Sequence, residues 1–318
     1  MNIFDSLLEK NTIFTDESKL DMNYIPEKLP HREKELKILS HLFVILLKRP
    51  NSISRKILIT GKTGIGKTVT LKYFGELLRK AMKSKNTNLK YIHVNCRKQR
   101  TSYKTLVMIV RAIDKSVPKR GYSLQDLLDI LIDLINGQDT HLLVVLDELN
   151  YIIEKDEDLL YYLTRINDDS LKNPQRLSII GVVRDVSCLN NLDQSTLSTL
   201  QRNIIKFNNY DKTQIFDILK YRAGLSFKHN VISNELIEVV SEVVYGKGDI
   251  RFGLNLLWKA GKIAEGQGLK EITTECIRQA NQDSFFFVPV DLIEDIPEKR
   301  LVFLLAIVIM LEKKRKPY

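Results

Sequence analysis

At 318 residues, the chain is long enough for two or three small domains, and its 44% hydrophobic and 28% charged residues are typical of a folded globular protein. The formal net charge of +10 favours a polyanionic partner, although lysine-rich solvated surfaces are an alternative explanation. Three widely separated cysteines and the lack of a signal peptide or bilayer-spanning apolar run exclude a disulfide framework and predict a cytoplasmic protein without a membrane partner.

The chain begins with an expected extension over residues 1–20, in which apolar and charged positions alternate. Pro26 and Pro30 then force an extended or turning backbone, and residues 33–47 have the periodicity of a helix. A polar loop leads into a short apolar strand at Ile57–Ile59. This strand introduces the most informative motif of the chain.

The motif is G-x-x-x-x-G-K-T, and it lies between the strand and a helix that we expect to continue to about Met82. Its glycines let successive backbone N–H groups surround a phosphate. Lys67 can reach the β- and γ-phosphates, and the Thr68 hydroxyl can ligate Mg²⁺. The alternative is a glycine-rich turn without a ligand. The predicted phosphate-binding residues are Gly61, Lys62, Thr63, Gly64, Ile65, Gly66, Lys67, Thr68 and Val69.

Strands and helices alternate through the following part of the chain. We expect strands at 91–95, 142–146, 177–183 and 204–207, and helices at 106–113, 124–135 and 159–166. The strand at 142–146 is apolar throughout, as in a central parallel strand. The alternation predicts an α/β domain built on a parallel sheet with helices on both faces.

Two acidic residues, Asp147 and Glu148, follow this central strand. Ligands bind at the carboxyl edge of open parallel sheets, so Asp147 can hold Mg²⁺ and Glu148 can polarise an attacking water. The alternative is a pair of acidic residues that merely ends a strand. The phosphate-binding motif favours the catalytic interpretation.

From Asp211 onward the pattern is helical only, with predicted helices at 213–222, 234–244, 250–265 and 273–283. We therefore expect a nucleotide-binding α/β domain at residues 21–209, followed by a small helical domain at 210–284. Residues 285–318 are expected to form a proline-containing linker and a final helix at 298–314.

The ordered set of motifs resembles the archaeal Orc1/Cdc6 family of replication initiators, which are AAA+ ATPases. Besides the two nucleotide motifs, the resemblance rests on residues 26–36, 118–123, 192–207 and 248–251. Residues 26–36 resemble the family's N-terminal box beside the adenine, and residues 118–123 resemble the turn of its initiator-specific insertion. Residues 192–207 resemble the surroundings of its arginine finger, and residues 248–251 resemble its sensor 2 motif. The resemblance covers roughly residues 21–285 and implies ATP or ADP with Mg²⁺ as ligands.

The resemblance implies roles for further residues. Arg251 would reach the γ-phosphate from the helical lid and join Lys67 and Glu148 in catalysis; without the resemblance it is an ordinary solvent-facing arginine. The remaining residues implied at the nucleotide are Tyr24, Ile25, Pro26, Tyr210 and Arg222. The first three of these can equally be ordinary core residues.

Two positions depart from the family pattern. The sensor 1 position, usually an asparagine, is Arg184, which cannot accept a hydrogen bond. The arginine-finger position is Ser195, which carries no charge, although such fingers contribute on the order of 10³–10⁵ in rate where they operate. We therefore predict tight nucleotide binding with slow or absent hydrolysis.

The resemblance also implies binding of double-stranded DNA through the insertion. Lys119 and Arg120 are the candidates for phosphate contacts, with a solvated charged turn as the alternative. The family's second DNA-binding module, a C-terminal winged helix, would be represented only by its first helix at 301–311, and we expect an incomplete winged-helix domain. The alternative is a final helix that docks on the lid.

The leading hypothesis is a nucleotide-dependent switch that binds ATP, Mg²⁺ and duplex DNA at a replication origin. It would be nucleoid-associated and would assemble with other initiator subunits and the replicative helicase. One alternative is a non-hydrolysing regulatory paralogue that acts through protein contacts, and another is an AAA+ transposition or signalling ATPase.

Overall fold

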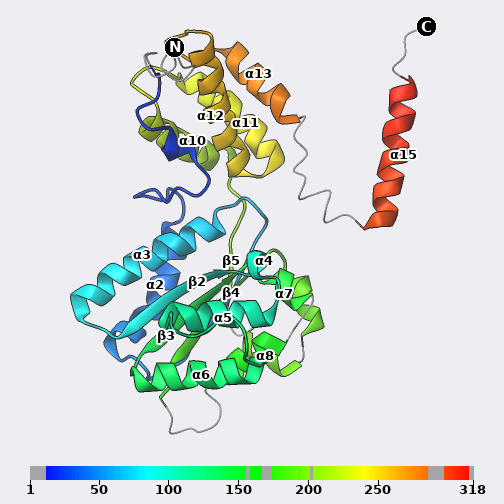
Figure 1. Ribbon diagram of the computed structural model, residues 1–318. Coiled ribbons are helices and arrows are strands. Elements are labelled where there is room, and N and C mark those ends of the chain that lie inside the picture. Colours follow the sequence, from blue (N-terminus) through cyan, green and yellow to red (C-terminus); the bar gives the residue numbers. More distant parts are fainter. Residues whose placement is uncertain are drawn as a thin grey trace, which may run out of the picture.

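The computed structural model of the chain contains a sheet-based domain, a helical domain and a C-terminal helix (Figure 1). The structure describes residues 12–154, 158–166, 174–192, 194–200, 203–285 and 297–314. Within these ranges, no helix combines the length and the apolar character that crossing a membrane requires.

Five strands form one parallel sheet in the order β2-β3-β4-β1-β5. They are β1 (Lys56–Thr60), β2 (Leu89–Asn95), β3 (His141–Asp147), β4 (Leu177–Val183) and β5 (Ile204–Lys206). Every residue of β3 and β4 is buried, which explains their nearly unbroken apolar sequences. The predicted parallel sheet is therefore confirmed, and the phosphate-binding loop follows β1 at its carboxyl edge.

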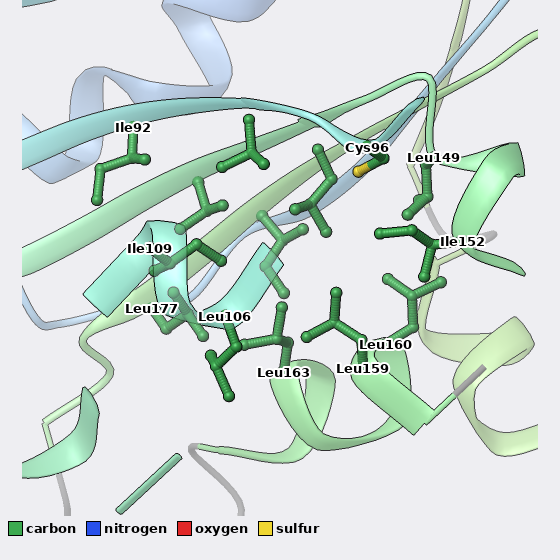
Figure 2. Close-up of a cluster of buried hydrophobic side chains, with 14 of the residues drawn as sticks. Ile92, Cys96, Leu106, Ile109, Leu149, Ile152, Leu159, Leu160, Leu163 and Leu177 are labelled. Atoms are coloured by element: carbon green, nitrogen blue, oxygen red, sulfur yellow. The ribbon is translucent and has the colours of Figure 1, made fainter. Parts of the chain in front are cut away.

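Helices cover both faces of this sheet. Because successive side chains of a strand point to opposite faces, Ile57 and Ile59 pack with α2 and α3, whereas Leu58 belongs to the core formed with α5, α6 and α8. Figure 2 shows part of this second core. The helices of the domain are α2 (Glu33–Lys48), α3 (Lys67–Lys85), α4 (Cys96–Gln99), α5 (Ser102–Ile113), α6 (Leu124–Gly137), α7 (Asn150–Ile153), α8 (Asp158–Arg165), η2 (Val186–Asn191) and α9 (Gln194–Leu200).

A helical domain, called the lid below, follows β5. Its helices are α10 (Lys212–Ser226), α11 (Asn234–Lys247), α12 (Ile250–Gly266) and α13 (Thr274–Phe285). Their apolar side chains enclose a core separate from the two cores of the sheet. Asp249 caps α12, since its carboxylate accepts a hydrogen bond from the Arg251 N–H at 2.9 Å. The predicted change to a helical pattern is confirmed.

Residues 12–24, called the N-terminal strap below, pack on the lid. The Phe14 ring stacks on that of Phe227 with centroids 4.8 Å apart. Leu20, in the short helix η1 (Glu17–Leu20), is buried in the lid core. Residues 1–11 lie outside the described ranges. From residue 12, the expected N-terminal extension is therefore part of the packing of the helical domain.

Helix α15 (Glu298–Lys314) has the bounds expected from the sequence. Its described apolar side chains, from Leu301 to Met310, are exposed, and this gives no support to docking on the lid. The predicted linker lies mostly outside the described residues. The assignment of α15 to a winged-helix domain stays a prediction.

Candidate nucleotide-binding site

A hollow of about 910 Å³ lies between the carboxyl edge of the sheet, the lid and the N-terminal strap. The predicted site residues that line it are Tyr24, Ile25, Pro26, Thr63, Gly64, Gly66, Lys67, Thr68, Val69, Asp147, Glu148, Tyr210, Arg222 and Arg251. Three other residues of the predicted loop, Gly61, Lys62 and Ile65, do not line it. The fold thus brings most of the predicted nucleotide residues around one space.

The phosphate-binding loop adopts a conformation that requires its glycines. Gly64 and Gly66 have φ values of +80° and +87°. A Cβ on Gly64 would lie 2.2 Å from the Asp249 carboxylate carbon, so lid and loop are in direct contact. The Ile250 N–H also donates to the Gly64 carbonyl at 3.2 Å. Helix α3 begins immediately after the loop, and its N-terminus favours an anion there.

Lys67 is directed along this loop. Its ammonium group donates to the carbonyls of Gly61 and Lys62, the latter at 2.7 Å. The pKa of Lys67 is lowered to about 8, mainly by burial; Asp147 opposes this shift, and the neighbouring cations Arg184 and Arg251 add to it. Three cationic side chains therefore converge on the region beside the loop, where a triphosphate would place most of its charge.

Thr68 and Asp147 bring together two oxygen atoms that could act as metal ligands. The Thr68 hydroxyl donates to the Asp147 carboxylate at 2.7 Å, and His93 Nε2 lies 3.2 Å from the same carboxylate oxygen. Burial raises the pKa of Asp147, but the hydrogen bonds from His93 and Thr68 outweigh it and the net shift is downward. A buried carboxylate kept ionised beside a hydroxyl fits Mg²⁺, which prefers oxygen ligands and retains water and phosphate in its shell. Among the described residues, no cluster of three or more His, Cys, Asp or Glu side chains suits a metal ion.

Glu148 is held by a residue that the sequence did not single out. The Asn95 side-chain amide, at the end of β2, donates to the Glu148 carboxylate at 3.1 Å. The Asn95 side-chain oxygen Oδ1 also accepts from the Lys98 N–H and so caps α4. Glu148 itself has a φ of +54°. Asn95 ends its strand as Asp147 ends β3, and the register of β2 against β3 pairs the two residues.

The two arginines of the site are held differently. Arg184 donates to the Tyr151 hydroxyl at 2.9 Å, and its guanidinium lies 5.4 Å from the centre of that ring. Arg251 lies 3.5 Å from the carboxylate of Asp249, the residue that caps its own helix. Both side chains are exposed at the edge of the hollow, so neither is committed to a buried partner.

Another part of the lining comes from the end of the strap, the residues that follow it and the lid. Tyr24, Ile25 and Pro26 line it together with Tyr210. Arg222 is only 6% exposed, and its guanidinium donates to the carbonyls of Lys19 and Asp21 at 2.6 and 2.8 Å. Its main contacts are therefore with the strap, which it fixes in place beside the hollow.

Arg32 is a second residue that the sequence did not indicate. It is 4% exposed, donates to the Ile65 carbonyl at 2.7 Å, and its guanidinium lies 4.0 Å from the centre of the Tyr210 ring. It thereby connects the segment before α2 to the phosphate-binding loop and to the segment that leads into the lid. In the sequence, Arg32 stands directly before a helix start rich in glutamate, and this pattern does not predict a contact with the phosphate-binding loop.

Two predicted sites lie away from the hollow. Lys119 and Arg120 are exposed in the loop between α5 and α6 and do not line it. Ser195 lies in α9, where its hydroxyl accepts a hydrogen bond from Arg165 of α8. The basic loop and the serine are thus on surfaces of the sheet domain that are distinct from the nucleotide pocket.

Comparison with known proteins places the chain in a family. Residues 54–184 match a family model described as an AAA domain, and residues 216–282 match one described as the Cdc6 AAA+ ATPase-type lid domain. The ORC1-type DNA replication protein 2 of Sulfolobus acidocaldarius is 34% identical over 97% of this chain and 77% of its own length. The chain belongs to the Orc1/Cdc6 family of ORC1-type DNA replication proteins. The resemblance stated from the motifs is confirmed.

Solved structures agree with this family assignment. The Aeropyrum pernix Orc1 protein, solved in complex with DNA, has a TM-score of 0.83 and 28% identity, covering 97% of this chain and 79% of its own. The ADP form of the Aeropyrum pernix ORC2 protein has a TM-score of 0.76 and 25% identity, covering 84% of this chain and 72% of its own. The AAA+ fold with a Cdc6-type lid is therefore shown for this chain.

Proposed function

We propose that this family member binds ATP or ADP with Mg²⁺ between sheet and lid, engages duplex DNA at a replication origin, and works as a slow nucleotide-dependent switch. One observation carries the nucleotide site: Lys67, the Thr68–Asp147 pair and Arg251 line the same hollow, although they come from three separate parts of the fold. The relative solved in its ADP form supports the choice of nucleotide.

Each residue would act on a different part of the ligand. The loop N–H groups and Lys67 bind the phosphates, and Tyr24, Ile25 and Pro26 contact the base. Thr68 and Asp147 would hold Mg²⁺, which neutralises phosphate charge when bound. Arg251 contacts the γ-phosphate from the lid, so that its contacts distinguish ATP from ADP.

Hydrolysis would use Glu148 to orient water and accept its proton. The water oxygen bonds to the γ-phosphorus, the bond to the bridging oxygen breaks, and ADP leaves with that oxygen. Asn95 donates a hydrogen bond to one carboxylate oxygen of Glu148. At the positions that the resemblance assigns to sensor 1 and the arginine finger, Arg184 replaces an amide and Ser195 supplies no charge to a neighbouring subunit. These three features support slow turnover.

DNA binding is supported by charge and by one relative. Lys119 and Arg120 are exposed at a turn that the Arg111 side chain braces through the Val117 carbonyl. The Aeropyrum pernix Orc1 relative was solved in complex with DNA.

Ser195 favours a second candidate function. In it, the chain is a regulatory paralogue that binds nucleotide statically and associates with other initiators or a helicase. The family match leaves a transposition or signalling ATPase without support.

Two titrations test the proposal. Binding of a fluorescent ADP should be tight and should weaken when EDTA removes Mg²⁺; the absence of nucleotide binding would refute the proposed site. Duplex DNA should bind with an affinity that falls steeply with salt, and Lys119→Ala with Arg120→Ala should reduce the salt slope. No DNA binding at low salt would favour the regulatory paralogue.

A further inference from the structure

A second hollow, of about 560 Å³, opens beside the nucleotide pocket. It is formed where three segments meet: the outer side of the phosphate-binding loop at Lys62 and Thr63, the residues after β4 at Arg184 and Asp185, and the end of lid helix α11 at Lys247. None of the functions assigned above uses this space.

The two hollows share part of their walls. Thr63 and Arg184 line both of them, so that they adjoin at the end of the pocket where the γ-phosphate would lie. One N–H group of Arg184 is engaged by the Tyr151 hydroxyl, and a guanidinium has five N–H donors in total. Arg184 can therefore donate toward either hollow from one position.

The charge of the second hollow is that of an anion site. Lys62, Arg184 and Lys247 contribute three positive charges, and Asp185 contributes one negative charge. The Asp185 carboxylate is already engaged, because it accepts the Ser187 N–H at 2.8 Å and caps η2. The Lys247 ammonium lies 3.4 Å from the centre of the Phe252 ring, which keeps its charge at the edge of the lid.

We propose that the second hollow binds inorganic phosphate, the product split from the γ-position, between the sheet residues Lys62 and Arg184 and the lid residue Lys247. This inference rests on the proposed nucleotide function. The phosphate passes from one hollow to the other beside Arg184, with no further bond made or broken. Because its ligands come from both domains, bound phosphate holds the lid against the sheet after cleavage, and its release frees the lid.

Phosphate is favoured over the other ligands that a basic hollow could take. The hollow adjoins the place where phosphate would be generated, whereas an acidic peptide or a nucleic acid strand would have to approach from solvent. Tyr245 lines the hollow but is 58% exposed, and no second aromatic lining side chain is present among the described residues to enclose a base. Binding of a peptide or an oligonucleotide there is accordingly an outcome of the test below.

The binding test fills the first pocket so that phosphate can occupy only the second. Protein saturated with Mg²⁺ and a non-hydrolysable ATP analogue is titrated with inorganic phosphate at constant ionic strength by calorimetry. Lys247→Glu should weaken phosphate binding about tenfold or more, and Lys247→Arg should retain it, because a charge-assisted contact is reversed in one and kept in the other. Lys270→Glu, an equal charge change at an exposed lid position, is the matched control.

The outcomes separate this inference from the proposed function. If the analogue itself does not bind, the proposed function fails first, and this is seen before phosphate is added. If the analogue binds but phosphate does not, or Lys247→Glu and Lys270→Glu weaken it equally, the second site is refuted. Preferential binding of an acidic peptide or an oligonucleotide would also overturn it.

A kinetic measurement gives a second readout. In a single turnover, ATP cleavage and the appearance of free phosphate are followed separately, the latter with a phosphate sensor. The inference requires a lag between the two events, which Lys247→Glu shortens at least several-fold while Lys270→Glu does not. Simultaneous cleavage and release in the unmodified protein would contradict it.

Discussion

The two walls of the nucleotide pocket differ in how their functional side chains are held. On the sheet wall, Thr68, Asp147 and Glu148 are connected by hydrogen bonds to neighbours within the same domain, and Asp147 is only 1% exposed. On the lid wall, Arg251 is exposed, and its side chain lies 3.5 Å from the carboxylate of Asp249, the cap of its own helix. The sheet wall is therefore organised before ligand arrives, whereas the lid wall can respond to which ligand is present.

Replacing Lys67 is expected to have the largest effect, since it removes the cation that the sheet wall offers to the phosphates. Lys67→Ala should weaken ATP binding by about 3 kcal/mol, on the order of 100-fold, through loss of charge-assisted phosphate contacts. Equilibrium titration with a fluorescent nucleotide measures it. Lys80→Ala, at an exposed position of the same helix, should leave affinity unchanged. Equal losses in the two variants would contradict the site.

Arg222 tests whether the strap belongs to the lid wall. Arg222→Ala should destabilise the protein by about 2 kcal/mol, because two strap carbonyls lose their donor in a buried setting. Trp258 is the single tryptophan and donates to Glu17 of the strap, so its fluorescence reports urea unfolding at this contact. Arg222→Lys, which keeps the charge but not the paired donors, should fall between. An unchanged unfolding midpoint would argue that the other contacts of the strap, among them those of Phe14 and Leu20, hold it without Arg222.

Replacing Arg251 tests whether the lid wall responds to which nucleotide is bound. Arg251→Ala should weaken ATP by about 1.4 kcal/mol, or tenfold, and ADP much less, since only ATP offers the γ-phosphate. The ratio of the two dissociation constants is the measurement. Lys259→Ala, farther along α12 and outside the lining of the pocket, is the control. A parallel loss of ATP and ADP affinity would show that the lid does not distinguish the two nucleotides.

Replacing Asn95 tests the sheet wall, and its expected effect is the smallest. Asn95→Asp keeps the oxygen that caps α4 but cannot donate to Glu148, so the carboxylate of Glu148 is released and repelled. The loss of one such hydrogen bond corresponds to about 1 kcal/mol, or a several-fold increase in steady-state ATP hydrolysis. Glu148→Gln in the same background should abolish the increase. Unchanged turnover in Asn95→Asp would mean that this hydrogen bond does not restrain Glu148.

Sequence alone predicted those parts of the site that depend on local pattern. The glycine spacing before Lys67 and the apolar run that ends at Asp147 have direct structural meaning. Strand β4 and helix α15 even have the predicted bounds. In each case, the signal that allowed the prediction is a pattern of residue types within a short stretch of sequence.

The contacts that sequence could not predict are long-range. Asn95 meets Glu148 only because β2 pairs with β3 in one register, and the order of strands in a sheet is not encoded in local periodicity. The docking of the strap on α12 and the insertion of Arg32 below the phosphate-binding loop depend likewise on tertiary packing. For this reason, the described part of the expected extension, residues 12–20, became part of the packing of the helical domain.

The N-terminal strap has a mechanical consequence. The chain passes between sheet and lid twice, once from the strap to α2, where Tyr73 of α3 donates to the Glu27 carbonyl, and once from β5 to α10. Two bodies joined at two separated points rotate freely only about the line through those points, and any other displacement strains one of the connections. The residues proposed to contact the base lie on one connection, so this axis runs past their part of the hollow.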